Sequence, residues 1–492
     1  MSDQSTAHGE LRRGSVGLFG CVGQAVAAIS PTGSVAVLGA LLVPLALTGT
    51  WLSSALMMVI VLCTAWIIVR LSRNVATTGG LYGITSRCGG RFGGVLTAFA
   101  LVFIGLAAIP AQIVIFANYV VSFLHLLGTG EGKGLLAAMV VAGTVLTVLF
   151  TVRDIRISVS LMLVLEIISV ASIIALLLVV LGHGHGSIFD SSQLSLKGVS
   201  VKGIALAMVI GIFAFEGFES ATVFGQEAKN PRRVIPQSVV LSVVLSGLFF
   251  IFASYSLVYG YHGNINGLTS AANPLSDLAH TNGVTWLSYV VDIGIIVSTF
   301  AVIVATVNLV ARAVFTLARE HLIPAPFAKT SSRTKSPVVA VSALLLEGFV
   351  LAIWVVLSSN NPVGFTGPFF TLAGFFAIAE YFIVSVGGPV FLARSRDLKP
   401  FDIITAVISA GGMAYVLYES LVPIPGYPDN IIAWMFIAVM LLAAGTYLAL
   451  RRYPEVLDRI GRSVIEDTDA ANLGETAAGG PAPAEAAGTT TD

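Results

Sequence analysis

The chain is poor in charged residues. Only 11% of its 492 residues are Asp, Glu, Lys or Arg, whereas about 25% is usual for a soluble protein. Its 26 basic residues balance its 26 acidic residues, so the formal net charge is zero. A nucleic-acid partner or a polybasic membrane anchor would need an excess of positive charge. The composition therefore favours neither of these partners and argues against a soluble fold.

Cysteine and histidine are scarce as well. The 3 cysteines show no Cys-x-x-Cys or Cys/His spacing, so we expect neither a disulfide framework nor a structural zinc site. The 7 histidines supply no nucleophile–base pair or metal cluster, and we find no repeated ring of pore charges. We therefore expect no enzyme, channel, metal or cofactor. We also expect no cleaved signal peptide, because no cleavage-site pattern follows the polar first 15 residues.

Apolar residues make up 56% of the chain and gather in long runs. A run of about 18 or more is long enough to cross a bilayer as a helix. We predict an all-α membrane protein with twelve spans, at approximately 16–47, 51–71, 92–124, 134–152, 157–181, 203–226, 236–261, 285–317, 338–358, 366–393, 402–421 and 431–450. We therefore expect residues 16–452 to form one transmembrane domain surrounded by the lipid bilayer.

Basic residues alternate between the two sides of these spans. All of them except Lys133, Lys197 and Lys202 fall in segments on the same side as the N-terminus. Such an excess marks the cytoplasmic side, so both termini are predicted to be cytoplasmic. Residues 1–15 form a short cytoplasmic tail, and residues 463–492, rich in Ala, Gly and Thr, are predicted to be a disordered one.

Two of the predicted spans are interrupted. The first contains Ser-Pro-Thr-Gly at positions 30–33, where proline removes a backbone donor and glycine permits a left-handed step. The sixth contains Gly217 between two carboxylates, Glu216 and Glu219. A proline kink or a packing glycine is the alternative interpretation of each break. Interruptions in the first and sixth spans together indicate an inverted-repeat transporter that binds its cargo near the middle of the membrane.

Other acidic residues lie deep in predicted spans, namely Glu166, Asp292 and Glu380. A carboxylate in hydrocarbon costs roughly 2.5–3.5 kcal/mol on insertion scales. Such a group can carry a proton, bind a cationic cargo, or form a hydrogen bond to a neighbouring helix. The sequence alone leaves these three roles open.

Three sequence blocks resemble the amino acid–polyamine–organocation (APC) permease superfamily. They are Phe-Ala-Phe-Glu-Gly-Phe-Glu at 213–219 with Glu-Ala-Lys-Asn-Pro-Arg-Arg-Val-Ile-Pro at 227–236, Thr-Gly-Gly-Leu-Tyr at 78–82, and Ala-Arg-Ala-Val-Phe-Thr-Leu-Ala-Arg at 311–319. The resemblance runs from about residue 11 to residue 450. It implies the leucine-transporter fold, a five-plus-five inverted repeat with broken first and sixth helices, followed here by two extra helices.

The resemblance also implies where cargo binds. Backbone groups around Ile29, Thr32 and Gly33 would receive a carboxylate, and the carbonyls of Phe213 and Glu216 would hold an amino group. Phe213 would close over the cargo, and Glu219 would link the sixth span to its neighbours. The implied substrate-binding residues are Ile29, Ser30, Thr32, Gly33, Phe213, Phe215, Glu216 and Gly217, and the implied coupling or gating residues are Glu166, Phe213 and Glu219.

Three residues depart from the family pattern. Pro31 lacks an N–H that would meet a carboxylate. Glu216 replaces an apolar residue, which favours a cationic cargo or shifts the pH response. Glu166 stands where proton-coupled members carry a lysine.

These features predict a secondary active transporter in the cytoplasmic membrane that imports amino acids or related amines by alternating access. We expect a proton as the coupling ion, with sodium as the alternative. A polyamine or organic-cation carrier, an amino acid or amine exchanger, and a nutrient sensor are the other interpretations. The sequence does not indicate an oligomeric state.

Overall fold

The computed structural model describes residues 17–460 except 73–79, 131, 153–155, 184–187, 222–227, 272, 331–335 and 458. Both predicted tails lie outside the described residues. The helices are α1 (Leu18–Ile29), α2 (Pro31–Val37), α3 (Val43–Ala46), α4 (Thr50–Ser72), α5 (Gly80–Cys88), α6 (Gly90–Leu126), α7 (Lys133–Val152), α8 (Arg156–Gly182), α9 (Ser191–Leu194), α10 (Val201–Phe213), α11 (Pro231–Gly260), α12 (Ile265–Ser270), α13 (Pro274–Thr281), α14 (Thr285–Arg319), α15 (Val338–Ser358), α16 (Pro362–Phe365), α17 (Gly367–Arg394), α18 (Pro400–Leu421), α19 (Asp429–Leu450) and α20 (Pro454–Leu457). A π-helical turn at Leu38–Leu42 and 3-10 turns at Leu47–Gly49 and Ala325–Ala328 complete the described helical elements.

Eleven of the described helical stretches are long and apolar enough to cross a membrane. The first of these, Leu18–Ser72, has 55 residues, nearly three times the roughly 20 that one crossing needs. It contains the first two predicted spans, and the 3-10 turn at Leu47–Gly49 joins them. The prediction of an all-α multi-pass membrane protein is confirmed, and each of the twelve predicted runs contains a described helix.

The sixth predicted span differs from the expected continuous run. Helix α10 ends at Phe213, and the chain continues through turns and a short 3-10 segment to Ala221. Residues 222–226 of that predicted span lie outside the described residues. The break predicted in this span is therefore present, although the helix ends earlier than its apolar pattern suggests.

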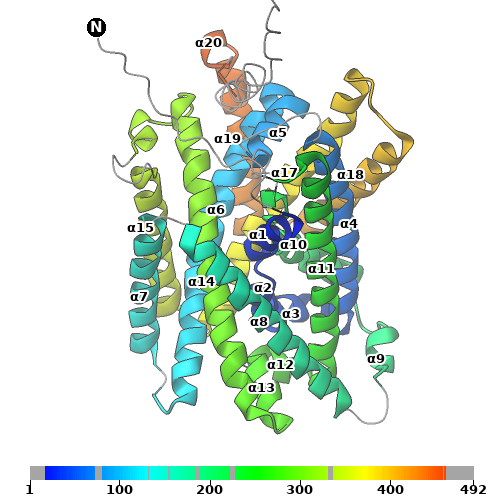
Figure 1. Ribbon diagram of the computed structural model, residues 1–492, viewed down its shortest axis with the longest axis vertical. Coiled ribbons are helices and arrows are strands. Elements are labelled where there is room, and N and C mark those ends of the chain that lie inside the picture. The colour runs from blue at the N-terminus through cyan, green and yellow to red at the C-terminus, as the bar shows by residue number, and fades with distance from the viewer. Residues whose placement is uncertain are drawn as a thin grey trace, which may run out of the picture.

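Long helices run side by side through the molecule. Figure 1 shows α5 and α20 at one end and α12 and α13 at the other, with α6 and α14 extending between them. Helices α10 and α17 approach closely at Gly374, where a Cβ atom would lie 2.3 Å from the carbonyl oxygen of Val209. Glycine at this position thus lets the sixth and tenth predicted spans meet backbone to backbone.

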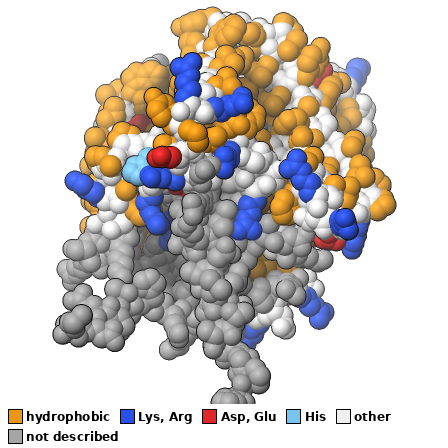
Figure 2. All heavy atoms as spheres, turned by 90° about the horizontal axis from the view of Figure 1, so that it is seen from above, with side chains coloured by type: hydrophobic (Ala, Val, Ile, Leu, Met, Phe, Trp, Pro, Cys, Tyr) orange, Lys and Arg blue, Asp and Glu red, His pale blue; other side chains and the backbone are white. Residues whose placement is uncertain are grey.

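The outer surface carries many exposed apolar side chains, among them Ile167, Leu346, Val407 and Leu441. Figure 2 looks onto the end that carries α20 and shows Lys and Arg side chains gathered among them. An apolar belt with basic residues at its end is the pattern expected of a protein surrounded by lipid. The assignment of this end to the cytoplasm remains a prediction.

Two polar contacts join elements near this end. Arg70, only 4% exposed, donates from Nε to both carboxylate oxygens of Asp402 at 3.1 and 3.2 Å, which links α4 to α18. The hydroxyl of Tyr82 on α5 donates to the carboxylate of Glu320, directly after α14. Tyr82 and Glu320 adjoin two of the blocks that carry the family resemblance, so the structure brings those blocks together.

Candidate functional site

The first helix break is a single left-handed residue. Ser30 has φ 51° and ψ 65°, and its N–H closes α1 on the carbonyl oxygen of Val26 at 2.9 Å. Pro31 then begins α2. Because the first N–H groups of a helix lack intrahelical partners, the N–H groups of Thr32 and Gly33 need acceptors from elsewhere.

Two other helices supply those acceptors. The N–H of Thr32 donates to Oε1 of Glu166 on α8 at 2.9 Å, and the N–H of Gly33 donates to Oγ of Ser298 on α14 at 3.2 Å. The hydroxyl oxygens of Ser30 and Ser298 lie 2.6 Å apart. A carboxylate at a helix N-terminus makes a charge-assisted hydrogen bond in a favourable position. The break is thus tied to α8 and α14 by buried polar groups.

The second break touches the first. After α10, Gly217 adopts φ +99°, and a Cβ atom there would lie 2.8 Å from Cβ of Ala28. Only glycine combines this backbone conformation with so close an approach. The unwound part of the sixth predicted span therefore lies against the end of α1, four residues before Thr32.

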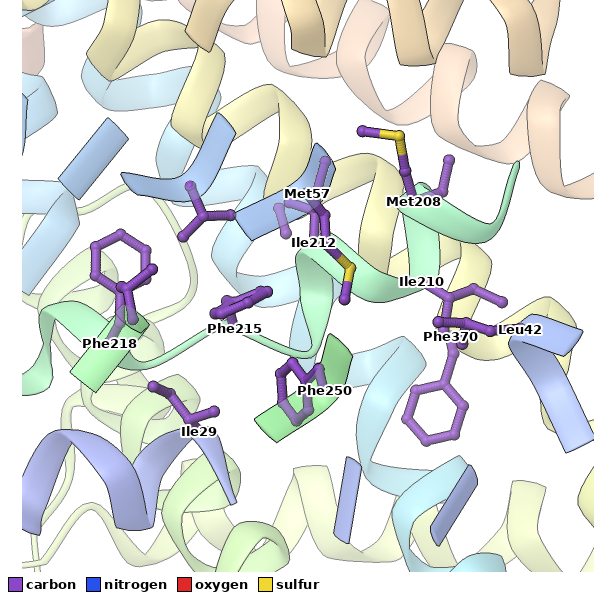
Figure 3. Packing of buried hydrophobic residues seen from close by; sticks show 14 of the residues in the cluster. Ile29, Leu42, Met57, Met208, Ile210, Ile212, Phe215, Phe218, Phe250 and Phe370 are labelled. Carbon is purple, nitrogen blue, oxygen red and sulfur yellow. The ribbon is translucent and has the colours of Figure 1, made fainter. Parts of the chain in front are cut away.

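Aromatic side chains surround this crossing. Figure 3 shows Phe215 and Phe218 on the segment after α10, with Ile29 of α1 nearby. Phe215 is fully buried, and its ring packs edge-on against Phe250 at 5.1 Å. The ring of Phe213 is half-buried and lies 5.9 Å from that of Phe370. Phe213 therefore keeps part of its side chain accessible, as a residue that closes over cargo requires.

The carbonyl groups expected to hold an amino group lie in the same segment. The carbonyl oxygen of Phe213 accepts the N–H of Glu216 at 2.8 Å. A carbonyl oxygen has a second lone pair, so this turn leaves capacity for another donor. The hydroxyl of Thr32 is fully buried and faces the carboxyl group of Glu166.

A second group of acidic residues lies beside the sixth-span break. Glu380 and Tyr381 are adjacent on α17 and fully buried, and the Tyr381 ring lies 5.5 Å from that of Phe218. Glu216 and Glu219 act electrostatically on both of them. The structure therefore brings Glu380 of the tenth predicted span to Glu216 and Glu219 of the sixth.

Asp292 belongs to a different location. Its Oδ1 accepts a hydrogen bond from Nδ2 of Asn273 at 2.7 Å, and the same amide donates to Ser122 Oγ at 3.3 Å. Asn273 directly precedes α13, so Asp292 connects α14 to the segment between α11 and α14. This arrangement fits the hydrogen-bonded alternative considered for a deep carboxylate.

The structure thus brings together Ile29, Ser30, Thr32 and Gly33 with Glu166, and brings Phe215, Glu216 and Gly217 against the same break. Their roles in binding cargo stay predictions. Sequence reasoning missed Ser298 and Tyr381, and it missed Tyr119, whose hydroxyl donates to the carbonyl oxygen of Ala36 at 2.8 Å. Hydroxyl residues are common in membrane helices, so only their spatial partners distinguish these three.

Known proteins with similar sequences are amino acid permeases and other transporters. A sequence model of the amino acid permease family matches residues 18–453. An uncharacterized transporter of Mycobacterium tuberculosis is 28% identical over 389 residues, covering 75% of this chain and 83% of the relative. A vacuolar cationic amino acid transporter of Arabidopsis thaliana is 25% identical over 186 residues (37% and 30% of the two chains). A branched-chain amino acid permease of Bacillus subtilis is 25% identical over 140 residues (28% and 29%).

Proposed function

The chain belongs to the amino acid permease family, and from that premise we propose that it imports amino acids or related amines by alternating access, coupled to protons. It is a transporter and not an enzyme. We place it in the cytoplasmic membrane with both termini inside, as its basic residues predict.

The contact between the two helix breaks carries this proposal. Gly217 lies against Ala28, and the N–H groups of Thr32 and Gly33 point to side-chain acceptors within four or five residues of that contact. A cargo carboxylate would take the place of those acceptors at the N-terminus of α2. The amino group would bind to the carbonyl groups of Phe213 and Glu216, and Phe213 would close over the cargo. Such use of broken helices explains why irregular backbone persists inside a membrane.

Glu166 offers a route for proton coupling. As a carboxylate it competes with the cargo for the N–H of Thr32, which it already binds at 2.9 Å. A proton on Glu166 would weaken it as an acceptor and free that N–H for the cargo carboxylate. Proton and cargo would then bind together, which is the requirement for symport. Sodium is the alternative coupling ion, because Glu166, Ser30 and Ser298 offer oxygen ligands.

Alternating access follows from the position of the breaks. In this proposal a four-helix bundle that contains both broken spans rocks against the remaining helices, as in other inverted-repeat transporters. Cargo enters from outside while the breaks are open to that side, and leaves when they open to the cytoplasm. An exchanger would use the same cycle without returning empty.

A cationic cargo is the second candidate. Glu216 and Glu380 lie beside the sixth-span break, and three of the relatives are named as cationic amino acid transporters. A relative from Bacillus subtilis named as a methylthioribose transporter shows that similar chains carry other solutes.

Uptake into proteoliposomes tests the proposal. The purified protein would be screened with radiolabelled neutral and basic amino acids and polyamines, with and without an inward proton gradient. We expect saturable uptake of at least one amino acid, faster with the gradient. Polyamine uptake alone would favour the organic-cation carrier. Binding without flux, in protein that remains folded, would contradict transport and favour a sensor.

A further inference from the structure

Two buried acids beside the sixth-span break, Glu216 and Glu380, have no positive partner within the described residues. Glu380 lies in the middle of α17, is fully buried, and has no hydrogen-bond partner on either carboxylate oxygen. Both carboxylate oxygens of Glu216 are likewise buried, with the Tyr381 hydroxyl beside them. A buried polar group without a partner is destabilising, and an ionised one is far more so. Such groups persist where a ligand or a proton satisfies them.

Tyr381 independently marks the same place. Its side chain is fully buried, and its hydroxyl lies beside the carboxyl groups of Glu216 and Glu219. A tyrosine needed only for packing against Phe218 could be a phenylalanine, because buried hydroxyls normally find a partner. Its hydroxyl therefore belongs to the polar cluster formed with Glu216 and Glu219.

The chemistry of the site favours an organic cation over a metal ion. Among the described residues, no group of three His, Cys, Asp or Glu side chains is close enough to hold a metal. Calcium and magnesium need a compact shell of six or more oxygen ligands. A guanidinium group instead presents five N–H donors in a broad plane, which suits acceptors spread over two carboxylates and one hydroxyl.

The position of the site matches one end of an amino acid. Glu216 directly precedes Gly217, which contacts Ala28 at the end of α1. An amino acid whose main-chain groups bind at the two breaks would therefore have its side chain free to reach toward α17. The cluster and the proposed main-chain site form one continuous region.

We propose that Glu216, Glu380 and the Tyr381 hydroxyl form the side-chain subsite of the cargo, and that they select a positively charged guanidinium or ammonium group. This inference rests on the proposed amino acid transport. One bound cation compensates one carboxylate, and the neighbouring carboxyl groups hold protons, since like charges so close in a low-dielectric region do not all ionise.

Binding of L-arginine and L-citrulline to the purified protein tests this subsite. The two have nearly the same shape, but citrulline carries a neutral ureido group in place of the guanidinium. We expect arginine to bind about tenfold more tightly, since hydrogen bonds to charged groups exceed neutral ones by a factor of about two to thirty. Glu380→Gln should bring the two affinities to within about threefold while citrulline binding persists, which also shows that the variant is folded.

Two further variants complete the test. Tyr381→Phe keeps the packing against Phe218 and should reduce the preference for arginine by a smaller factor, about threefold to tenfold. Glu347→Gln is the matched control, because Glu347 lies on α15 and no carboxylate of the cluster acts on it. It should leave the preference unchanged.

Equal wild-type affinities for arginine and citrulline would overturn this inference while leaving amino acid transport intact. So would a Glu380→Gln variant that keeps the preference and changes only the pH dependence of uptake, because the cluster would then store protons. Failure to bind either ligand, together with no uptake of any amino acid, would overturn both the subsite and the proposed function.

Discussion

Substituting Glu166 separates its structural role, as acceptor for the Thr32 N–H, from its proposed role in proton coupling. Its Oε1 accepts the Thr32 N–H at 2.9 Å in a buried position. Glutamine keeps an acceptor there but loses the charge and the ability to release a proton. Charged hydrogen bonds contribute about 1.5–3 kcal/mol and neutral ones about 1 kcal/mol, so Glu166→Gln should lower the free energy of unfolding by about 1 kcal/mol. Glu166→Ala leaves the N–H without an acceptor and should cost about 1–3 kcal/mol.

The effect of Glu166→Gln on transport should not follow its effect on stability. In a one-to-one symport, each pH unit of gradient contributes about 1.36 kcal/mol, or about tenfold accumulation. We expect Glu166→Gln to remove this dependence on the gradient while counterflow exchange of the cargo remains. Thermal unfolding of the purified variants and uptake per folded protein measure the two effects separately. Glu347→Gln serves as the control for loss of a membrane carboxylate elsewhere.

A Glu166→Gln variant that accumulates cargo with its normal response to the proton gradient would refute this reasoning. The N–H contact would then have only a structural role. A response to a sodium gradient in the wild-type protein would show that Glu166 acts with Ser298 as part of a cation site instead.

Three further predictions concern other parts of the fold. Gly217→Ala combines a left-handed backbone, which costs an L-residue about 1–2 kcal/mol, with a Cβ 2.8 Å from that of Ala28; uptake per folded protein should fall at least tenfold, and normal uptake would contradict close contact of the breaks. Asp402→Asn removes the buried one of the two carboxylates that pair with Arg70 and leaves Asp397 at 3.2 Å, so it should lower the free energy of unfolding by about 1.5–3 kcal/mol in thermal or denaturant unfolding; an unchanged stability would show that the Asp402 pair is dispensable. Burial raises the pKa of the Cys88 thiol from 9.0 to about 12, so at pH 8 it holds about a thousandfold less thiolate than an ordinary thiol. With the other two cysteines replaced by serine, N-ethylmaleimide should label Cys88 far more slowly than a peptide thiol; labelling at the peptide's rate would mean that this segment is open to water.

Much of the architecture could be predicted from the sequence because bilayer-length apolar runs are a strong signal. Both helix breaks could also be located. Pro31 cannot continue the hydrogen bonding of α1, and a glycine such as Gly217 is the residue type that readily adopts φ +99°. The end of α10 at Phe213 could not, because Ala214, Phe215 and Phe218 continue the same apolar pattern whether or not the backbone is helical. Composition does not record where a helix unwinds.

The partners of the site residues could not be predicted either. Glu166 and Ser298 meet the first break from helices more than 130 positions away in the chain. A serine among apolar residues carries no sign of its partner, because many serines in membrane helices bond only to their own backbone. The proximity of Glu216 and Glu380 is likewise a result of how α10 packs on α17.

The most direct test of the whole account is the steady-state accumulation of a transported amino acid in proteoliposomes. We predict that an inward gradient of one pH unit drives about tenfold accumulation in a one-to-one symport, and that collapsing the gradient with a protonophore releases the accumulated cargo. Equilibration to equal concentrations inside and outside, at every proton gradient applied, would contradict proton-coupled import.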